Sequence, residues 1–323
     1  MNTQIAFDPG FGNIKLYGPQ GPLVMQSAVG VGGGPVLARM TGLRKTSPPL
    51  RVRTHAGEFF LGEGAHDWGR PVENLDFDRL TGSPELMALL YGALTKYGMA
   101  MEACDLIVGL PIHVLASDEA PAIKRAVRSA LRGEHTWFVG EQECQVQIEN
   151  VRLTSQPVGA MFDYLLDEDG QMRAARQAAL KGEIGILGVG MNTVDLLVVR
   201  NGSPVSRFTA GDTLGVRRLL ELCRGTAEYS LAELDMLLRR RALDVDGATR
   251  IWWSETVGFI EKHWGSTFRR FHVIVVVGGG VVLLRDALLH RFREKVHIPD
   301  DPIIATARGL YKYSCMMARR QCG

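Results

Sequence analysis

The chain has 323 residues, of which 46% are hydrophobic and 22% charged, and its formal net charge is +2. A chain of this length predicts two domains or two lobes, because a single core rarely grows so large. The near-neutral balance argues against generic nucleic-acid binding through a large positive field and leaves only a local basic patch open.

The cysteines lie far apart and form no C-x-x-C pair: Cys104, Cys144, Cys223, Cys315 and Cys322. Neither a disulfide framework nor a zinc site has this spacing, so we expect reduced thiols. The longest apolar run, residues 273–284, is interrupted by glycines and is too short to span a bilayer, and the N-terminus has no signal-peptide pattern. We therefore expect a cytoplasmic protein without membrane contact.

The first element is an apolar strand that ends in a glycine-rich turn, IAFDPGFGNIK at residues 5–15. Apolar alternation resumes at Ile14 and Leu16, which predicts a β-hairpin. Glycines at the tip leave backbone amides uncovered, so the turn could wrap an anion while Asp8 holds a cation beside it. A purely structural hairpin is the alternative, and the motif taken alone favours it.

The rest of the first half alternates short strands and helices. Glycines and prolines at residues 29–50 predict a loop or a pair of short irregular strands. Ser83 and Pro84 open a helix with a cap residue and a first-turn proline. The remaining predicted elements are a two-stranded ribbon at 51–65, a buried strand at 105–111 and a helix at 120–131.

The second half begins with a strand, a helix that starts at Pro157, and then a second glycine hairpin, IGILGVGMNTVDLLVVRNGSPVSRF at 184–208. This hairpin repeats the arrangement at residue 5. Two such hairpins, one near the start of each half, predict related lobes whose turns face each other across a cleft.

Further helices are predicted downstream, with Trp252, Phe259 and Ile260 as core residues. The last helix carries small residues, Ala305 and Gly309 among them, which permit close backbone approach. These elements are helices at 213–222, 231–241 and 249–263, a buried strand before the triple glycine at 278–280, a helix after it, and the final helix from about 305.

In this order, five segments resemble the motifs of the actin-like ATPase superfamily, which also contains sugar kinases and heat-shock chaperone nucleotide domains. No single motif is specific, but five in sequence order are hard to produce by chance. They are the first phosphate loop at 8–15, the first connecting segment at 156–160, the second phosphate loop at 188–195, the adenosine segment at 277–280 and the second connecting segment at 305–309.

Within the superfamily, the segments DFDRLTGSPELMALLYGAL at 76–94 and LIVGLPIHVL at 106–115 are most similar to the ParM and StbA plasmid-segregation actins and their archaeal relatives. This resemblance implies an α/β chain with the actin-like fold, in which two RNase H-like lobes surround an interdomain nucleotide cleft. Domain I is expected at 1–155, with the C-terminal helix 306–323 packing back on it, and domain II at 156–305.

The resemblance also implies a bound nucleotide, ATP or GTP, with Mg²⁺. Asp8 would hold Mg²⁺ through water, with Asp195 as a second metal residue, and Lys15 would approach the phosphates. Gln156 would orient the attacking water, so the catalytic set is Gln156, Asp8 and Asp195. The implied cofactor-binding residues are Gly10, Phe11, Gly12, Asn13, Lys15, Gly190, Met191, Asn192, Thr193, Gly211, Asp212, Gly278, Gly279 and Gly280.

One position departs from the family pattern. The second phosphate loop usually opens with an aspartate, whereas this chain has Gly188 there and keeps Thr193 and Asp195. We therefore expect nucleotide binding with slow hydrolysis. A satisfied structural carboxylate is nearly as good an interpretation of Asp195 as a metal ligand, and a turn cap and a helix N-cap are the structural alternatives for Asp8 and Gln156.

Three functions remain open. The first is an ATPase or GTPase that assembles head to tail into a filament and positions DNA through an adaptor, with no direct nucleic-acid contact. The second is a small-molecule kinase, for which Asp212 is the candidate base. The third is a nucleotide-binding regulator with little turnover. The arginine clusters at 239–241, 269–270 and 319–320 are interpreted as solvated faces, with contact to an adaptor or neighbouring subunit as the minority interpretation.

Overall fold

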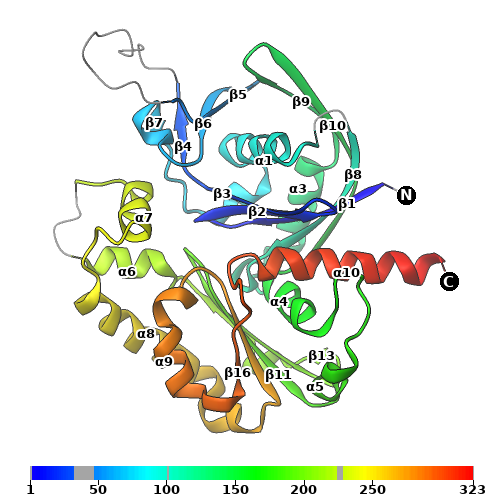
Figure 1. Cartoon of the computed structure of the whole chain (residues 1–323), viewed down its shortest axis with the longest axis vertical. Helices are drawn as coiled ribbons and strands as arrows, with labels where there is room; N and C mark the ends of the chain where they lie inside the picture. Colours follow the sequence, from blue (N-terminus) through cyan, green and yellow to red (C-terminus); the bar gives the residue numbers. More distant parts are fainter. Residues whose placement is uncertain (1, 33–46, 100–101, 224–227, 323) are drawn as a thin grey trace.

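Two β-sheets, one in each half of the chain, form the upper and lower lobes of the computed structural model (Figure 1). The structure describes residues 2–32, 47–99, 102–223 and 228–322. The first sheet has the strand order β3-β2-β1-β8-β10-β9-β5-β6-β4-β7, and the second has the order β13-β12-β11-β15-β16, with β14 paired to β12.

The upper lobe is built from residues before the end of β10. Its strands are β1 (Thr3–Pro9), β2 (Asn13–Gly18), β3 (Gly21–Gln26), β4 (Val29–Val31), β5 (Leu50–Thr54), β6 (Gly57–Leu61), β7 (Arg70–Pro71), β8 (Glu102–Leu110), β9 (Gly133–Val139) and β10 (Gln142–Ser155). Its helices are α1 (Pro84–Tyr97), α2 (Ile112–Leu115) and α3 (Ala120–Leu131), with short 3₁₀ turns η2 (Ala65–Asp67) and η3 (Phe77–Thr81).

The lower lobe follows directly. Its helices are α4 (Gln156–Leu165), α5 (Gln177–Lys181), α6 (Val216–Leu222), α7 (Leu231–Arg239), α8 (Asp246–Trp264), α9 (Val281–Phe292) and α10 (Ala305–Cys322). Its strands are β11 (Glu183–Val189), β12 (Val194–Arg200), β13 (Ser203–Pro204), β14 (Ala210–Asp212), β15 (Val273–Val277) and β16 (Val296–His297), with a 3₁₀ turn η6 at Gly265–Arg270.

The two lobes repeat one topology. The order β3-β2-β1-β8-β10 in the first sheet matches β13-β12-β11-β15-β16 in the second, each with two antiparallel hairpins followed by parallel neighbours. After the last of these strands in each sheet the chain continues into a helix, α4 after β10 and α10 after β16. The repeated hairpins therefore occupy equivalent places in their lobes.

The lower sheet is buried on both faces, which explains the continuous apolar run at β15. Ile274 and Val276 pack with Trp252 of α8, whereas Val273, Val275 and Val277 join the cluster that holds Ala160 of α4. Because side chains alternate along a strand, the run serves two separate cores. Each fully buried valine stabilises the fold by roughly 1.5–3 kcal/mol.

Helices α4 and α10 pack closely where two glycines meet. A Cβ atom on Gly309 would collide with the carbonyl oxygen of Gly159 and would lie 2.5 Å from the amide nitrogen of Asp163. The prediction that small residues in the last helix allow close approach is therefore confirmed. Helix α10 contacts β1, β2 and β8 of the upper sheet as well as α4, so it lies between the two sheets (Figure 1).

Several predicted elements are confirmed. Ser83 caps α1 by accepting a hydrogen bond from the amide of Leu86 at 3.3 Å, with Pro84 in the first turn. The helix at 120–131 has the predicted bounds, and Trp252, Phe259 and Ile260 are buried. Cys104, Cys144 and Cys315 are free thiols. Within the described residues, no helix is both long enough and apolar enough to cross a membrane.

Other predicted boundaries were wrong. The helix predicted from residue 213 begins at Val216, with Gly215 at its N-cap. Helix α4 begins at Gln156 rather than Pro157, with Ser155 at the N-cap, so Gln156 is not the cap residue. The region at 29–50 was predicted as a loop or a pair of short irregular strands; its residues 29–31 do form the short strand β4, and residues 33–46 lie outside the described chain.

Candidate functional site

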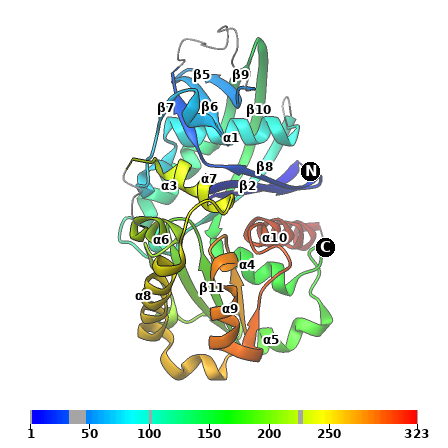
Figure 2. The same cartoon turned by 60° about the vertical axis from the view of Figure 1, so that its left-hand side comes forward.

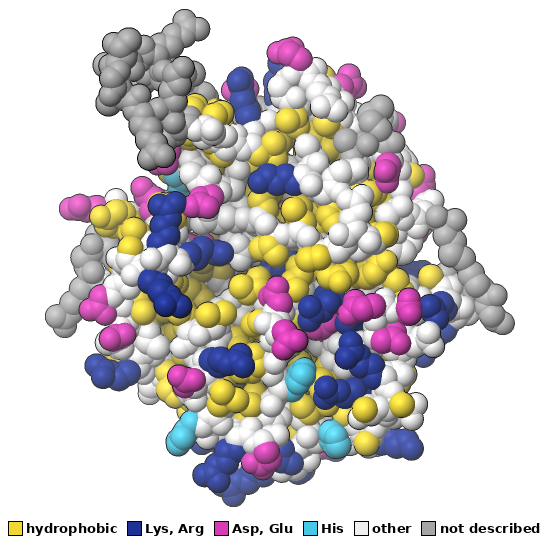
Figure 3. All heavy atoms as spheres, viewed as in Figure 1, with side chains coloured by type: hydrophobic (Ala, Val, Ile, Leu, Met, Phe, Trp, Pro, Cys, Tyr) yellow, Lys and Arg dark blue, Asp and Glu magenta, His cyan; other side chains and the backbone are white. Residues whose placement is uncertain are grey.

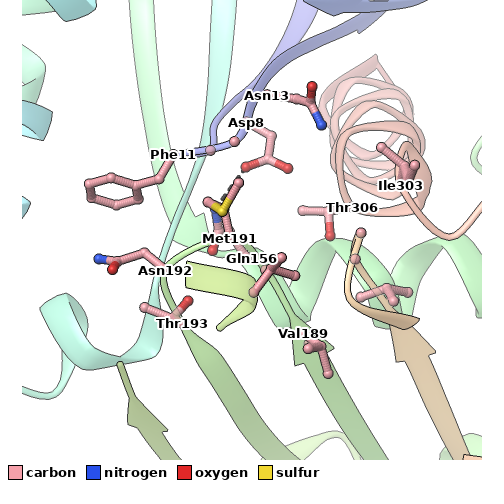
Figure 4. Close-up of a pocket in the computed structure, with 18 of the residues that line it drawn as sticks. Asp8, Phe11, Asn13, Gln156, Val189, Met191, Asn192, Thr193, Ile303 and Thr306 are labelled. Carbon is pink, nitrogen blue, oxygen red and sulfur yellow. Dashed lines mark hydrogen bonds between the residues drawn. The ribbon is translucent and has the colours of Figure 1, made fainter. Parts of the chain in front are cut away.

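A cavity of about 480 Å³ lies between the lobes, and both glycine hairpins contribute to its wall (Figure 4). The hairpins have the same geometry, since Pro9 pairs with Ile14 below the first tip and Val189 with Val194 below the second. The predicted site residues in the wall are Asp8, Gly10, Phe11, Gly12, Asn13, Lys15, Gln156, Gly190, Met191, Asn192, Thr193, Asp195, Gly278 and Gly279.

Asp8 stands at the base of the first hairpin with both carboxylate oxygens engaged. Lys15 Nζ lies 2.8 Å from Oδ2 and Gln156 Nε2 donates to Oδ1 at 2.7 Å. A carboxylate only accepts hydrogen bonds, so the amide of Gln156 must turn its nitrogen to Asp8. Its Oε1 is then left as an acceptor at the cavity wall, next to the N-terminus of α4.

Asp195 stands on β12 of the second hairpin and links it to the upper lobe. Its Oδ1 accepts from the amide of Ile112 at 2.9 Å, and its Oδ2 accepts from Thr193 Oγ1 at 2.9 Å. Burial raises the pKa of this carboxyl to about 6, against the lowering effect of those two bonds. The structure thus describes a hydrogen-bonded carboxylate that joins two lobes, and its role as a metal residue stays a prediction.

Three predicted cofactor residues lie outside the cavity wall. Gly211 is covered by α2 and Asp195, since an added Cβ would lie 2.8 Å from the amide nitrogen of His113. Asp212 is exposed, and its Oδ1 accepts from the amide of Thr213 at 2.7 Å. Gly280, the last of the three consecutive glycines, packs against Val189 and Trp252. Strand β14 and Gly280 therefore support the wall without forming it, whereas Val282 and Leu283 in the first turn of α9 do line the cavity.

Sequence reasoning missed the part of the wall that α7 and α10 provide. Asp235, Arg239 and the following Arg241 line the cavity from α7, and Thr306 lines it from α10. Arg239 and Arg241 are exposed, as the interpretation of cluster 239–241 as a solvated face expected, but they also line the cavity, which that interpretation did not include. The i, i+4 spacing of Asp235 and Arg239 was the available signal, because it predicts an ion pair on one helix face.

Helix α7 crosses from the lower lobe to the first hairpin (Figure 2). Arg239 donates to Asn13 Oδ1 at 3.1 Å and to Asp235 Oδ2 at 2.9 Å, and Gln26 Nε2 donates to the same Asp235 oxygen at 3.1 Å. Arg240 forms a further, exposed ion pair with Glu63 at 2.6 Å. These contacts hold α7 over one edge of the cavity.

An aromatic stack supports the tip of the first hairpin. The Phe11 ring points away from Asp8 in Figure 4 and meets Phe77 of η3 edge-on at 5.6 Å, while Phe77 stacks on His113 at 5.0 Å. The guanidinium of Arg79 lies 4.6 Å from the centre of the Phe11 ring. Burial lowers the pKa of Arg79 to about 10. Because His113 follows Ile112, the stack connects the first hairpin to the residue that binds Asp195.

The topology and the two-hairpin cavity define the actin-like fold. Residues 6–159 match the family described as actin like proteins, N-terminal domain. This match confirms the predicted resemblance to actin-like proteins over those residues. A comparison with curated protein sequences finds no match.

Solved structures extend this similarity to the whole chain. An archaeal actin homolog, Ta0583, superposes with a TM-score of 0.74 at 20% identity over 98% of this chain and 99% of that one. The apo psk41 ParM protein gives 0.72 at 14% identity over 99% of both chains. A ParM from a 15-stranded filament of Clostridium botulinum gives 0.74 at 20% identity over 97% and 99%. At these identities the similarity establishes the fold.

Proposed function

We propose that this chain binds a nucleoside triphosphate, ATP or GTP, with Mg²⁺ between its lobes and assembles head to tail into filaments. One observation carries the proposal: two hairpins of equal length, from different lobes, present glycine-rich tips to one cavity of about 480 Å³. Backbone amides at such tips suit phosphate oxygens, because they donate without the entropy cost of long side chains.

The donor set fits Mg²⁺, since a hard cation prefers oxygen ligands and Asp8 presents a carboxylate at the cavity wall. Asp8 would hold the ion through water, and Asp195 is the second proposed residue. When bound, the ion would neutralise charge that develops on the phosphate oxygens. Among the described residues, no group of three or more His, Cys, Asp or Glu side chains could hold a metal by itself, so the phosphates would complete the site.

For hydrolysis, Gln156 is the proposed water-orienting residue. Its Nε2 is held by Asp8 at 2.7 Å, which leaves Oε1 to accept a hydrogen bond from a water beside the terminal phosphate. That water would attack phosphorus as the bond to the bridging oxygen breaks, giving nucleoside diphosphate and phosphate. Lys15 would supply positive charge near the phosphates. Gly188 supplies no carboxylate, so we propose slow turnover.

Assembly is proposed by analogy with structural relatives. The Clostridium botulinum ParM and Alp12 were solved as filaments, and Ta0583 was also solved with ADP. We propose that this chain likewise forms a cytoplasmic filament, with an adaptor protein linking it to a DNA cargo. The formal net charge of +2 suits a filament that does not touch the DNA itself.

The kinase alternative loses its proposed base, because Asp212 is exposed and lies outside the cavity wall. The regulator alternative keeps some support from Gly188. Light scattering and negative-stain microscopy with ATP, GTP and slowly hydrolysed analogues separate these functions. Nucleotide-dependent filaments are expected. Binding without assembly would favour the regulator, and hydroxyl-dependent release of diphosphate would favour the kinase.

A further inference from the structure

A separate cavity of about 350 Å³ lies at the C-terminal end of α4, whereas the nucleotide cavity lies at its N-terminal end. Its wall is formed by α4, the segment that follows it, the chain after β16, and α10. Charged side chains of both signs gather beside α10 on this face (Figure 3). Four cationic side chains, Arg173, Arg176, Arg308 and Lys312, stand in the wall against the three carboxylates of Asp163, Glu168 and Asp300.

The inner charges of this cavity are already paired. Arg308 donates from Nε and Nη2 to the two oxygens of Asp163, both at 2.6 Å. Lys312, whose side chain is 2% exposed, lies 3.0 Å from Asp163 and 2.8 Å from Glu168. These two cations and two carboxylates therefore neutralise one another, and they leave two arginines facing one carboxylate.

The two outer arginines are oriented but have no carboxylate partner among the described residues. Arg173 donates from Nε to the carbonyl oxygen of Leu166 at 2.9 Å, which leaves both terminal amino groups available. The guanidinium of Arg176 lies over the Tyr164 ring, 4.1 Å from its centre. A planar guanidinium held in this way is a preformed fork for a phosphate or carboxylate.

The pKa of His297 responds to the charges that line the cavity. Its ring meets Tyr164 edge-on at 4.9 Å. Burial lowers the pKa of His297, and Arg176 and Arg173 lower it further, while Asp163 and Asp300 oppose them. The imidazole is therefore neutral near pH 7, with one N–H to donate and an excess of positive charge around it.

We propose that this cavity binds the phosphate group of a small phosphorylated molecule through Arg173, Arg176 and His297. Two oriented guanidinium groups and a neutral imidazole offer several hydrogen-bond donors with net positive charge, which suits a dianion. The volume of about 350 Å³ leaves room beside a phosphate for the group that carries it. The site is spatially separate from the other cavity, because the two share no wall residue.

The test is an NMR titration of the His297 ring with inorganic phosphate or glycerol 3-phosphate, at constant ionic strength set by chloride. The His297 signal is assigned by its loss in a His297→Asn variant. We expect either probe to raise the pKa of His297 by about one unit at saturation, because a bound anion stabilises the imidazolium. Tenfold tighter binding of the ester would identify an esterified ligand, whereas equal binding would identify free phosphate.

Matched variants locate the site. Arg176→Gln should abolish the response, Arg176→Lys should retain part of it, and Arg269→Gln, which removes an exposed arginine of η6, should leave it unchanged. Lys15→Gln should also leave it unchanged, since Lys15 lies in the other cavity. Thermal unfolding checks that each variant is folded. The proposal is overturned if neither probe shifts the folded wild-type signal, or if the shift persists in Arg176→Gln.

Discussion

Asp195 occupies, in the second glycine hairpin, the register position that Lys15 occupies in the first. Lys15 faces Asp8 across its hairpin, whereas Asp195 faces Gly188. The first hairpin therefore holds an ion pair of 2.8 Å at its base, and the second holds a lone carboxylate. That carboxylate finds its partners in Thr193 and in the amide of Ile112 instead.

The first prediction concerns Gly188. An added Cβ there would lie 3.7 Å from the Asp195 Cβ, an ordinary contact, so Gly188→Asp fits the hairpin. We expect this variant to raise the phosphate-release rate by at least about tenfold, because it places a carboxylate near the proposed metal and the attacking water. Gly188→Asn, of the same shape without the charge, is the control. Equal rates in the wild type and Gly188→Asp would sink the slow-hydrolysis hypothesis.

The second prediction follows from the raised pKa of Asp195, about 6 against an ordinary 3.8. The folded state disfavours the ionised form, so stability is lost as pH rises from about 4 through 6. Asp195→Asn removes that loss. The unfolding free energy of the variant, relative to that of the wild type, should therefore rise by up to about 3 kcal/mol between about pH 4 and pH 6. Urea unfolding between pH 4 and 7.5 measures it, and a pH-independent difference would contradict the expectation.

The third prediction uses one chemical change at two glycines. Gly309→Ala should destabilise the fold by about 3 kcal/mol, because its Cβ collides with Gly159 where α10 crosses α4. Gly258→Ala, on the exposed side of α8 with open space around it, should stabilise by about 0.5–1 kcal/mol. Denaturant unfolding gives both values. Effects of the same sign would show that the contact between the two helices is looser than described.

The fourth prediction concerns neighbouring arginines of the α7 region. Arg239→Gln leaves the buried Asp235 without its cation and removes the bond to Asn13, so we expect a loss of about 1–3 kcal/mol and weaker nucleotide binding. Arg240→Gln breaks only an exposed pair with Glu63 and should cost less than about 0.5 kcal/mol. Urea unfolding and nucleotide titrations compare the two variants. Equal losses would contradict the inference that the contacts of Arg239 hold α7 over the edge of the cavity.

The local elements could be predicted because their signals are local. Ser83 and Pro84 open α1, and Asn201 and Gly202 both have positive φ in the tight turn between β12 and β13, as such residues tolerate. The two glycine hairpins could also be recognised as copies. Apolar residues alternate in the strands on either side of similar glycine-rich tips. The sequence therefore already predicted that the two lobes are related and that the hairpin tips face each other.

The amino-acid pattern alone was enough to predict the pair of hairpins, their order with the connecting helices, and the glycine at position 188 in place of the second-loop aspartate. Which groups complete the cavity became visible only in the folded chain. Residues far apart in sequence meet there: Arg239 donates a hydrogen bond to Asn13, and the backbone amide of Ile112 donates one to Asp195. Periodicity and turn chemistry act over a few residues, whereas hydrogen bonds between lobes depend on how whole sheets are placed.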